Sequence, residues 1–160
     1  MGSGKSTLGK RFAKTVGYSF VDIDSMIINR TNLVVAQIFE KYGENYFREM
    51  EKICLLEISK MQNIVVATGG GLPCFFNNME IMNNTGDTVY LKTSVDELFN
   101  RLQVNRLKRP LLRDKSDIEL RKYIQEMLTK REPIYSQCKH ILTSDNPKPE
   151  MLKTILGFAN

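Results

Sequence analysis

The residues best suited to chemistry lie at the start of the sequence, in the run Gly2-Ser3-Gly4-Lys5-Ser6-Thr7. This run matches the second half of the phosphate-binding loop G-x-x-x-x-G-K-[ST]. Its glycines let backbone N–H groups turn toward an anion, Lys5 supplies positive charge for the β- and γ-phosphates, and the hydroxyl of Ser6 is a candidate Mg²⁺ ligand. Apolar residues at helical spacing follow, so the loop leads into a helix N-terminus, which favours phosphate. We therefore expect a nucleotide site; the alternative is a flexible basic loop.

Two carboxylates, Asp22 and Asp24, end a short strand predicted at 18–24. Residues i and i+2 of an extended chain share a face, so both can lie over the carboxyl end of the strand, where open α/β sheets bind ligands. The alternative is an acidic turn in which Asp24 or Ser25 caps the next helix. Because a phosphate-binding loop precedes them, we favour a functional role for both carboxylates.

Three successive glycines, Gly69, Gly70 and Gly71, follow the apolar β-branched run at 64–67. Such a run is typical of a strand buried on both faces. Glycines at its end allow a ligand to approach the backbone closely; alternatively they form a flexible turn. Residues 74–84, rich in Met and Phe, are interpreted as a helix that packs in the core rather than as part of a site.

Residues 25–61 are predicted to be helical in pieces, with a stop at Gly43. The side chains predicted to face inward after this stop are Phe47, Met50, Ile53, Cys54 and Ile58. Arg48 lies one turn from Glu44 and from Glu51 on the same piece. On spacing alone, Arg48 can be a solvated charge paired with either glutamate, a contact that contributes little to stability.

The rest of the chain alternates strands and helices. Strands are predicted at 88–91 and 140–142, and helices at 94–106, at 116–131 and near the C-terminus. Between two of these helices the sequence is basic, is broken by Pro110 and has no clean period, so we predict a mobile lid at about 107–115; the alternative is an ordinary surface loop. The alternation predicts an α/β fold, a three-layer sandwich with helices on both faces of a parallel sheet.

Composition limits the function classes. The 160 residues fit one domain with its own core, and the net charge of +5 suits an anionic small substrate. The sequence has no basic run interleaved with aromatic residues, which is the pattern that indicates nucleic-acid binding. Three widely spaced cysteines indicate neither a zinc site nor a disulfide frame, so reduced thiols in a cytosol are the simplest interpretation. No stretch approaches the ~18 apolar residues of a membrane helix.

Six motifs together resemble the shikimate kinases, small members of the nucleoside-monophosphate-kinase-like group of P-loop enzymes. They are G-S-G-K-S-T at 2–7, D-I-D at 22–24, F-R-E-M-E at 47–51, T-G-G-G at 68–71, R-P-L-L at 109–112 and K-R-E-P-I-Y at 130–135. The first is generic, whereas the other five, in this order and at these separations, are specific. The resemblance covers nearly the whole chain and implies a P-loop kinase fold in a single domain, 1–160, with substrate-binding helices at about 25–61 and the lid at about 107–115.

The resemblance implies a nucleotide side of the site. The ATP phosphates would lie on Gly2, Ser3, Gly4, Lys5, Ser6 and Thr7. One Mg²⁺ would be held by Ser6 and, through water, Asp22. Arg109 on the lid would reach the transferring phosphate, and Arg101 would pack on the adenine, with the turn at Asn146 and Pro147 as a further candidate for adenine contact.

The resemblance also implies a substrate side. Asp24 would bind the acceptor hydroxyl and act with Lys5 and Arg109 in catalysis, while Arg48 and Arg131 would grip the carboxylate of shikimate. The backbone of Gly69, Gly70 and Gly71 would contact the ring. The implied activity is ATP-dependent phosphorylation of the 3-hydroxyl of shikimate in aromatic amino acid biosynthesis, by a cytoplasmic monomer without a nucleic-acid or membrane partner.

Two alternatives remain open. One is another small P-loop kinase, for gluconate or a nucleoside monophosphate; the other is a nucleotide-binding module without catalysis. An adenylate kinase is expected to carry an Asp-Gly-Phe-Pro-Arg run where this chain has 68–71. The motifs around Arg48 and Arg131 favour shikimate over gluconate, and these arginines together with Asp24 argue against a module that lacks an acceptor.

The phosphate-binding loop lacks its first glycine and the hydrophobic strand that normally precedes it, because the sequence begins at Met1. By the resemblance, that strand would lie between the strands at 64–67 and 88–91. We therefore predict that the natural protein begins about ten residues earlier, with an apolar β-branched strand that ends in glycine.

Overall fold

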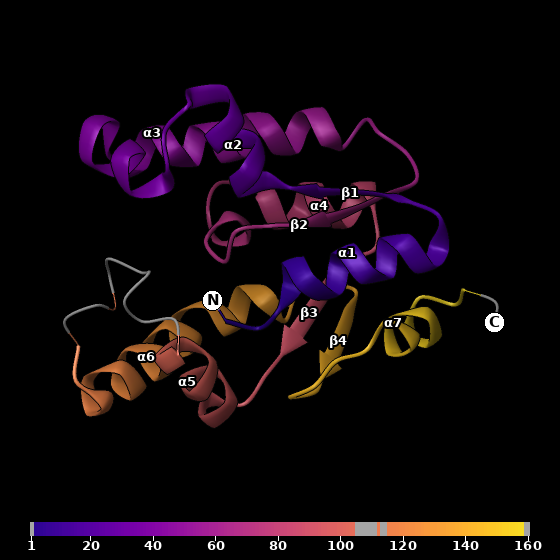
Figure 1. Cartoon of the computed structure of the whole chain (residues 1–160). Helices are drawn as coiled ribbons and strands as arrows, with labels where there is room; N and C mark the ends of the chain where they lie inside the picture. Colours follow the sequence, from indigo (N-terminus) through magenta and orange to yellow (C-terminus); the bar gives the residue numbers. More distant parts are fainter. Residues whose placement is uncertain (1, 105–111, 113–114, 159–160) are drawn as a thin grey trace.

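The computed structural model describes residues 2–104, 112 and 115–158, and the structural statements below refer to these residues. In chain order its elements (Figure 1) are α1 (Lys5–Val16), β1 (Ser19–Asp22), α2 (Ile23–Thr31), α3 (Val35–Ile58), β2 (Ile64–Ala67), the 3₁₀ turn η1 (Leu72–Cys74), α4 (Asn78–Thr85), β3 (Val89–Lys92), α5 (Val95–Val104), α6 (Asp117–Tyr135), β4 (His140–Thr143) and α7 (Pro149–Ile155).

The strands form two parallel pairs. β1 pairs with β2, with Ser19 opposite Ile64, and β3 pairs with β4, with Val89 opposite His140. Within the described ranges no ladder joins β2 to β3. The prediction of parallel strands is therefore confirmed, but the sheet is divided at its middle.

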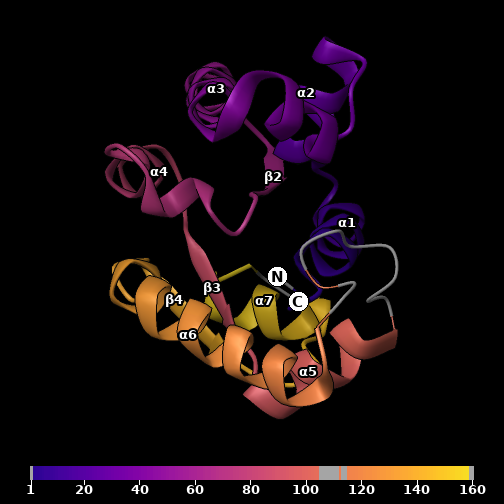
Figure 2. The same cartoon turned by 90° about the vertical axis from the view of Figure 1, so that its left-hand side faces the viewer.

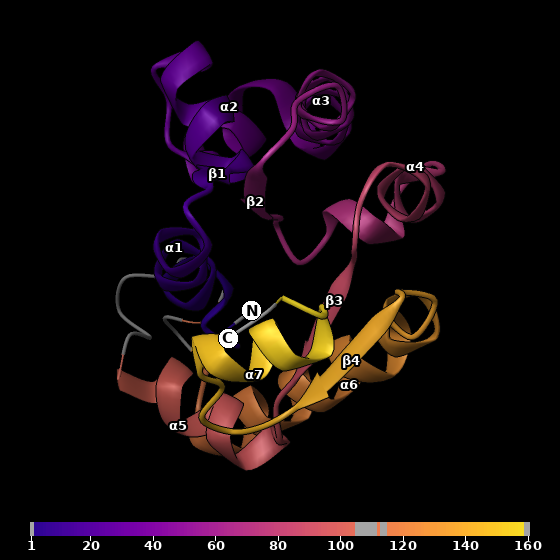
Figure 3. The same cartoon turned by 90° about the vertical axis from the view of Figure 1, so that its right-hand side faces the viewer.

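Helices cover both faces of the strands, as the three-layer prediction requires. Figures 2 and 3 show α1 and α7 on one side and α4 and α6 on the other, with α2 and α3 beyond β1. α1 contacts β1, β2 and α7, so it bridges the two strand pairs. None of the helices in the described ranges is both long and apolar enough to cross a membrane.

Apolar side chains gather in three clusters. The first lies under α2 and α3 and includes Ile23, Ile27, Ile38, Phe47, Cys54 and Leu72. The second joins α5 to α6 through Leu98, Phe99, Leu102, Leu112, Leu120 and Ile124. The third joins α1 to α7 and β4 through Leu8, Phe12, Leu142 and Leu152.

The strand predicted at 64–67 is less buried than expected. Ala67 is buried, but Ile64, Val65 and Val66 are only half-buried. The physical reason is the divided sheet, because among the described residues β2 has a neighbouring strand on the β1 side alone.

Two predicted boundaries near the site are wrong. β1 ends at Asp22 rather than at residue 24, and Asp22 itself caps α2 by accepting a hydrogen bond from the backbone N–H of Ser25 at 3.2 Å. Asp24 therefore lies in the first helical turn, so neither Asp24 nor Ser25 is the cap. The helix predicted at 74–84 is a 3₁₀ turn followed by α4 from Asn78.

Candidate active site

The loop before α1 has the backbone that phosphate binding needs. Gly2 and Gly4 have φ values of +77° and +85°, in the left-handed region that side-chain-bearing residues rarely adopt. α1 begins at Lys5 with no acidic residue in its first turn, so its N-terminal dipole is not neutralised there. An open hollow of about 530 Å³ lies beside this turn, lined mainly by Gly2, Gly4, Lys5, Ser6, Thr7 and Arg101.

Ser6, which lines this hollow, contacts Asp22 at the end of β1. The Ser6 hydroxyl donates to Asp22 Oδ2 at 2.7 Å, while Asp22 Oδ1 holds the start of α2. Within the described ranges no three His, Cys, Asp or Glu side chains gather as a metal cluster. A hydroxyl and a carboxylate are nevertheless the hard oxygen donors that Mg²⁺ takes when most of its remaining ligands are water and phosphate.

Asp24 lies within range of the charges of Lys5, at the start of α1, and of Arg48, on α3. Its Oδ1 is buried and has no hydrogen-bond partner among the described residues. Burial and then the neighbouring charge of Asp22 raise the pKa of Asp24, while Lys5 and Arg48 oppose that rise. A half-buried carboxylate with one oxygen that lacks a hydrogen-bond partner in the described structure is suited to accept a hydrogen bond from a hydroxyl.

Arg48 lies on α3 and is only 8% exposed. Its Nε and Nη2 donate to Glu44 Oε1 at 3.1 and 2.7 Å, and its Nη1 donates to Glu51 Oε2 at 2.6 Å. The ring of Phe75 lies 4.2 Å from its guanidinium carbon. The pairs that the sequence suggested are both formed, but the interpretation of Arg48 as a solvated charge is wrong.

Glu51 is fully buried, and its Oε1 has no hydrogen-bond partner in the described structure. Burial raises the pKa of Glu51, and Arg48 and Arg131 oppose that rise. These buried oxygens of Glu51 and Asp24 both lie against the backbone of Gly69. A Cβ at Gly69 would lie 2.8 Å from Glu51 Oε1 and 2.9 Å from Asp24 Oδ1.

The glycine run after β2 touches charged side chains directly. A Cβ at Gly71 would lie 2.5 Å from Arg48 Nη1, so this position needs a glycine for close approach. The carbonyl of Gly70 accepts a hydrogen bond from the hydroxyl of Tyr135. The run is thus a packed corner rather than a free turn.

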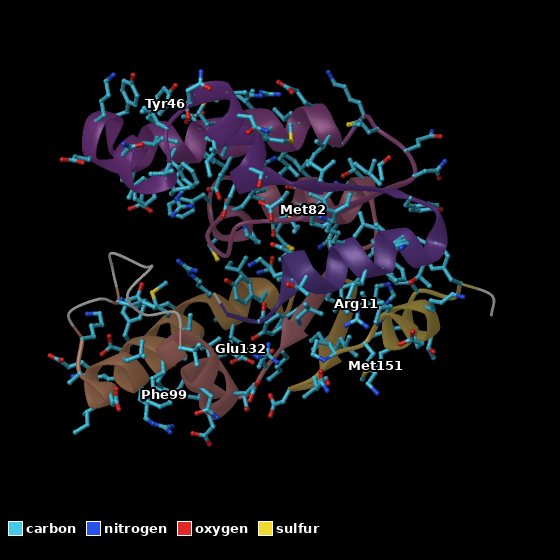
Figure 4. All side chains as sticks on the ribbon, viewed as in Figure 1. Arg11, Tyr46, Met82, Phe99, Glu132 and Met151 are labelled. Atoms are coloured by element: carbon cyan, nitrogen blue, oxygen red, sulfur yellow. The ribbon has the colours of Figure 1, made fainter. Side chains whose placement is uncertain are left out.

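Arg131 comes to this corner from α6. Its charge opposes the rise that burial causes in the pKa values of Glu51, Cys74 and Tyr135. A small cavity is lined by the glycine run and by Tyr135 of the same helix, together with Ser3 and Lys5 among others. Met82, labelled in Figure 4, and Met79 line the same cavity from α4.

Arg101 connects α5 to the loop before α1 and to the turn at Asp145. Its Nε donates to Glu97 Oε1 at 2.7 Å, its Nη1 donates to the carbonyl of Gly2 at 3.2 Å, and its Nη2 donates to the carbonyl of Asp145. The side chain of Asp145 accepts from the N–H and the hydroxyl of Ser94, both at 2.8 Å. The turn that contains Asn146 is therefore fixed beside the phosphate-binding loop.

Arg109 and most of the predicted lid lie outside the described residues. Of 107–115, the structure describes Leu112, which is fully buried against α5 and α6, and Lys115, whose Nζ lies 5.2 Å from the ring centroid of Tyr123.

A family model described as shikimate kinase matches residues 1–159. The chain belongs to the shikimate kinase family. It is 49% identical to the shikimate kinase of Phocaeicola vulgatus over 91% of this chain and 83% of that protein. It is also 49% identical to the shikimate kinase of Parabacteroides distasonis over 86% of this chain and 79% of that protein.

Two solved shikimate kinases share its fold. The crystal structure from Bacteroides thetaiotaomicron matches with a TM-score of 0.94 at 40% identity, covering 99% of this chain and 94% of that one. The Acinetobacter baumannii enzyme in complex with shikimate matches with a TM-score of 0.87 at 31% identity, covering 98% and 89%. The predicted P-loop kinase fold is confirmed, and the chain is a kinase.

Three residues around Arg48 and Arg131 were not predicted as part of the site: Glu51, Phe75 and Tyr135. Glu51 carried a usable signal, because it lies four residues from Phe47 and three from Cys54, on the buried side of α3. Phe75 was assigned to the core, and nothing in its spacing indicated an arginine as its neighbour. Tyr135 lay beyond the predicted end of its helix, which continues through Pro133 to Tyr135.

Proposed function

We propose that this chain transfers the γ-phosphoryl group of ATP to the 3-hydroxyl of shikimate, in aromatic amino acid biosynthesis, as a cytoplasmic monomer. The observation that carries the proposal is the meeting of Asp24, Arg48 and Arg131 around the corner formed by Gly69–Gly71, beside the phosphate-binding loop. That corner offers cationic groups for a carboxylate and an open carboxylate oxygen for a hydroxyl.

On the nucleotide side, residues Gly2–Thr7 would hold the ATP phosphates through backbone N–H groups and Lys5. Arg101 would lie beside the adenine, near the turn at Asn146 and Pro147. Ser6 and Asp22 would hold one Mg²⁺, which supplies charge neutralisation on the phosphates. The exposed position of the Ser6–Asp22 pair supports this assignment.

On the substrate side, Arg48 and Arg131 would bind the carboxylate of shikimate. They come from different helices, so together they fix the orientation of the ring as well as neutralise its charge. Gly69, Gly70 and Gly71 would line the ring with backbone atoms. This leaves the 3-hydroxyl facing Asp24.

The transfer itself needs positioning and charge neutralisation more than covalent chemistry. Asp24 would orient the hydroxyl and accept its proton as the oxygen bonds to the γ-phosphorus and the bond to ADP breaks. Lys5 would stabilise the negative charge that develops on the transferred group. Arg109, with the lid at 107–115, would add a second cation there and exclude water.

A coupled ADP-release assay tests the proposal. Purified protein with ATP and Mg²⁺ is offered shikimate, gluconate, AMP or GMP in separate reactions. We expect ADP release above background with shikimate alone, and a product phosphorylated at the 3-hydroxyl. Turnover of gluconate or of a nucleotide without turnover of shikimate would reject the proposal in favour of another small kinase.

A further inference from the structure

Contacts surround the guanidinium of Arg48 on almost every side. Glu44 accepts from Nε and Nη2, Glu51 accepts from Nη1, and the ring of Phe75 covers one face. The backbone of Gly71 lies against Nη1 and Nη2, and the whole side chain is only 10% exposed. An incoming carboxylate therefore finds little of this guanidinium open.

Charge also opposes an incoming anion. The guanidinium of Arg48 is already paired with the carboxylates of Glu44 and Glu51. The carboxylate of Asp24 interacts electrostatically with Arg48 and with the carboxylate of Asp22. Among the described residues, the cations facing them are Arg48, Arg131 and Lys5. In this part of the chain four carboxylates thus face three cations, which is a poor setting for a further negative charge unless one carboxylate leaves.

Glu44 is the partner that can leave. Its side chain is 56% exposed, whereas that of Glu51 is 1% exposed, so only Glu44 regains water when its contact breaks. It also follows a break in α3, because Gly43 has φ 82° and ψ 169° and interrupts the helical backbone. No other residue crowds Gly43, since an added Cβ there meets no atom within 4 Å in the described structure.

We propose that Glu44 is a displaceable internal ligand of Arg48. Its carboxylate holds the guanidinium in place in the empty enzyme and leaves the Nε–Nη2 edge when the carboxylate of the substrate arrives, with Gly43 as the hinge. Glu51 stays in contact throughout and keeps Arg48 aimed at the corner of Gly71. Glu44 thus competes with the substrate and sets how strongly a carboxylate must bind to enter. Only the identity of the incoming carboxylate rests on the proposed function.

Substitution of Glu44 by glutamine tests the proposal, because it removes the charge and keeps the size. Shikimate and cyclohexanecarboxylate, a carboxylate without hydroxyl groups, are titrated separately into the wild type and Glu44→Gln, and NMR chemical shifts report binding. We expect Glu44→Gln to bind both ligands more tightly, by roughly two- to fivefold, the scale of losing one exposed competing ion pair. The affinity for ATP should not change.

Glu49→Gln is the matched control, because Glu49 is an exposed glutamate on the same helix. Unchanged or weaker carboxylate binding in Glu44→Gln would overturn the proposal and make Glu44 a positioning residue. An equal gain in Glu49→Gln would also overturn it, as a general effect of net charge. If no variant binds shikimate but Glu44→Gln gains affinity for cyclohexanecarboxylate, the proposed substrate fails and the role of Glu44 stands.

Discussion

Arg48 shows how one residue depends on a set of neighbours that are far apart in sequence. Its charge is matched by Glu44 and Glu51 on its own helix, while Phe75 and Gly71 come from the segment after β2. Removing the arginine would leave Glu51 buried without its ionic partner, and a buried unpaired charge is costly. A change at Arg48 therefore affects the packing of the site as well as its charge.

Substitutions of the two arginines and of the loop lysine should change different kinetic parameters. Arg48→Ala and Arg131→Ala should each raise the KM for shikimate, because losing one partner of a desolvated charge pair costs about 2–5 kcal/mol, or roughly 30-fold and more in affinity. Lys5→Ala should instead lower kcat, because its contacts strengthen as charge develops. Steady-state kinetics with each substrate varied in turn checks this, and an equal loss of ATP affinity in all three variants would contradict it.

Asp24 should set the acid side of the pH profile. Burial and Asp22 raise its pKa above the usual 3.8. A base must be ionised, so activity should fall as pH decreases through that raised pKa, at a higher pH than an ordinary aspartate would give. Asp24→Asn should slow transfer by ~10²-fold or more and should remove the fall in activity at low pH. The dependence of kcat/KM on pH, measured for the wild type and the variant, checks both expectations. A near-normal kcat in the variant would exclude Asp24 as the base.

Gly71 should tolerate no side chain, because the guanidinium of Arg48 occupies the space that a Cβ would need. A Cβ there lies 2.5 Å from Arg48 Nη1, so Gly71→Ala must displace the guanidinium. We expect a higher KM for shikimate with the KM for ATP unchanged, measured by the same assay. Wild-type KM values for both substrates would mean that Arg48 moves without loss of function.

At the scale of the element, α3 shows where sequence patterns suffice and where they do not. The break at Gly43 was predicted from the sequence and is present. Of the predicted inward stripe, Phe47, Cys54 and Ile58 are buried and Met50 packs against the same core. Ile53 was misassigned, because it is 45% exposed, and the buried Arg48 and Glu51 were missed. Hydrophobic periodicity assigns charged residues to the surface. Here Arg48 and Glu51 pair with each other inside the protein, so apolar spacing could not reveal them.

The role of Gly43 in the break of α3 can be tested by measuring the free energy of unfolding. Gly43 has a backbone conformation that is almost confined to glycine, so Gly43→Ala should lower the free energy of unfolding by about 1–3 kcal/mol. Gly86→Ala is the control, because Gly86 has φ −168° and also has open space around it. Urea unfolding of both variants measures the difference. Equal stability of the two would show that the α3 break relaxes without cost.

At the scale of the whole molecule, the site is assembled from both strand pairs. Asp24 and Arg48 belong to the part around β1 and β2, while Arg131 and Tyr135 come from α6, which packs against α5 and η1. The motifs at 22–24, 47–51, 68–71 and 130–135 were recognised from the sequence, and the structure brings all four together. Their separations could not show that Tyr135 would hold the carbonyl of Gly70, because that contact depends on how α6 crosses the corner.

The division between β2 and β3 has a consequence for solvent exchange. In a parallel pair, alternate N–H groups of each strand point away from its partner, so those of β2 and β3 face the space between the pairs. Unbonded amides there exchange with deuterium without unfolding. In this chain we therefore expect faster deuterium exchange at alternate amides of 64–67 and 89–92 than at the amides bonded within each strand pair. Equally slow exchange throughout both segments would mean that those amides have partners.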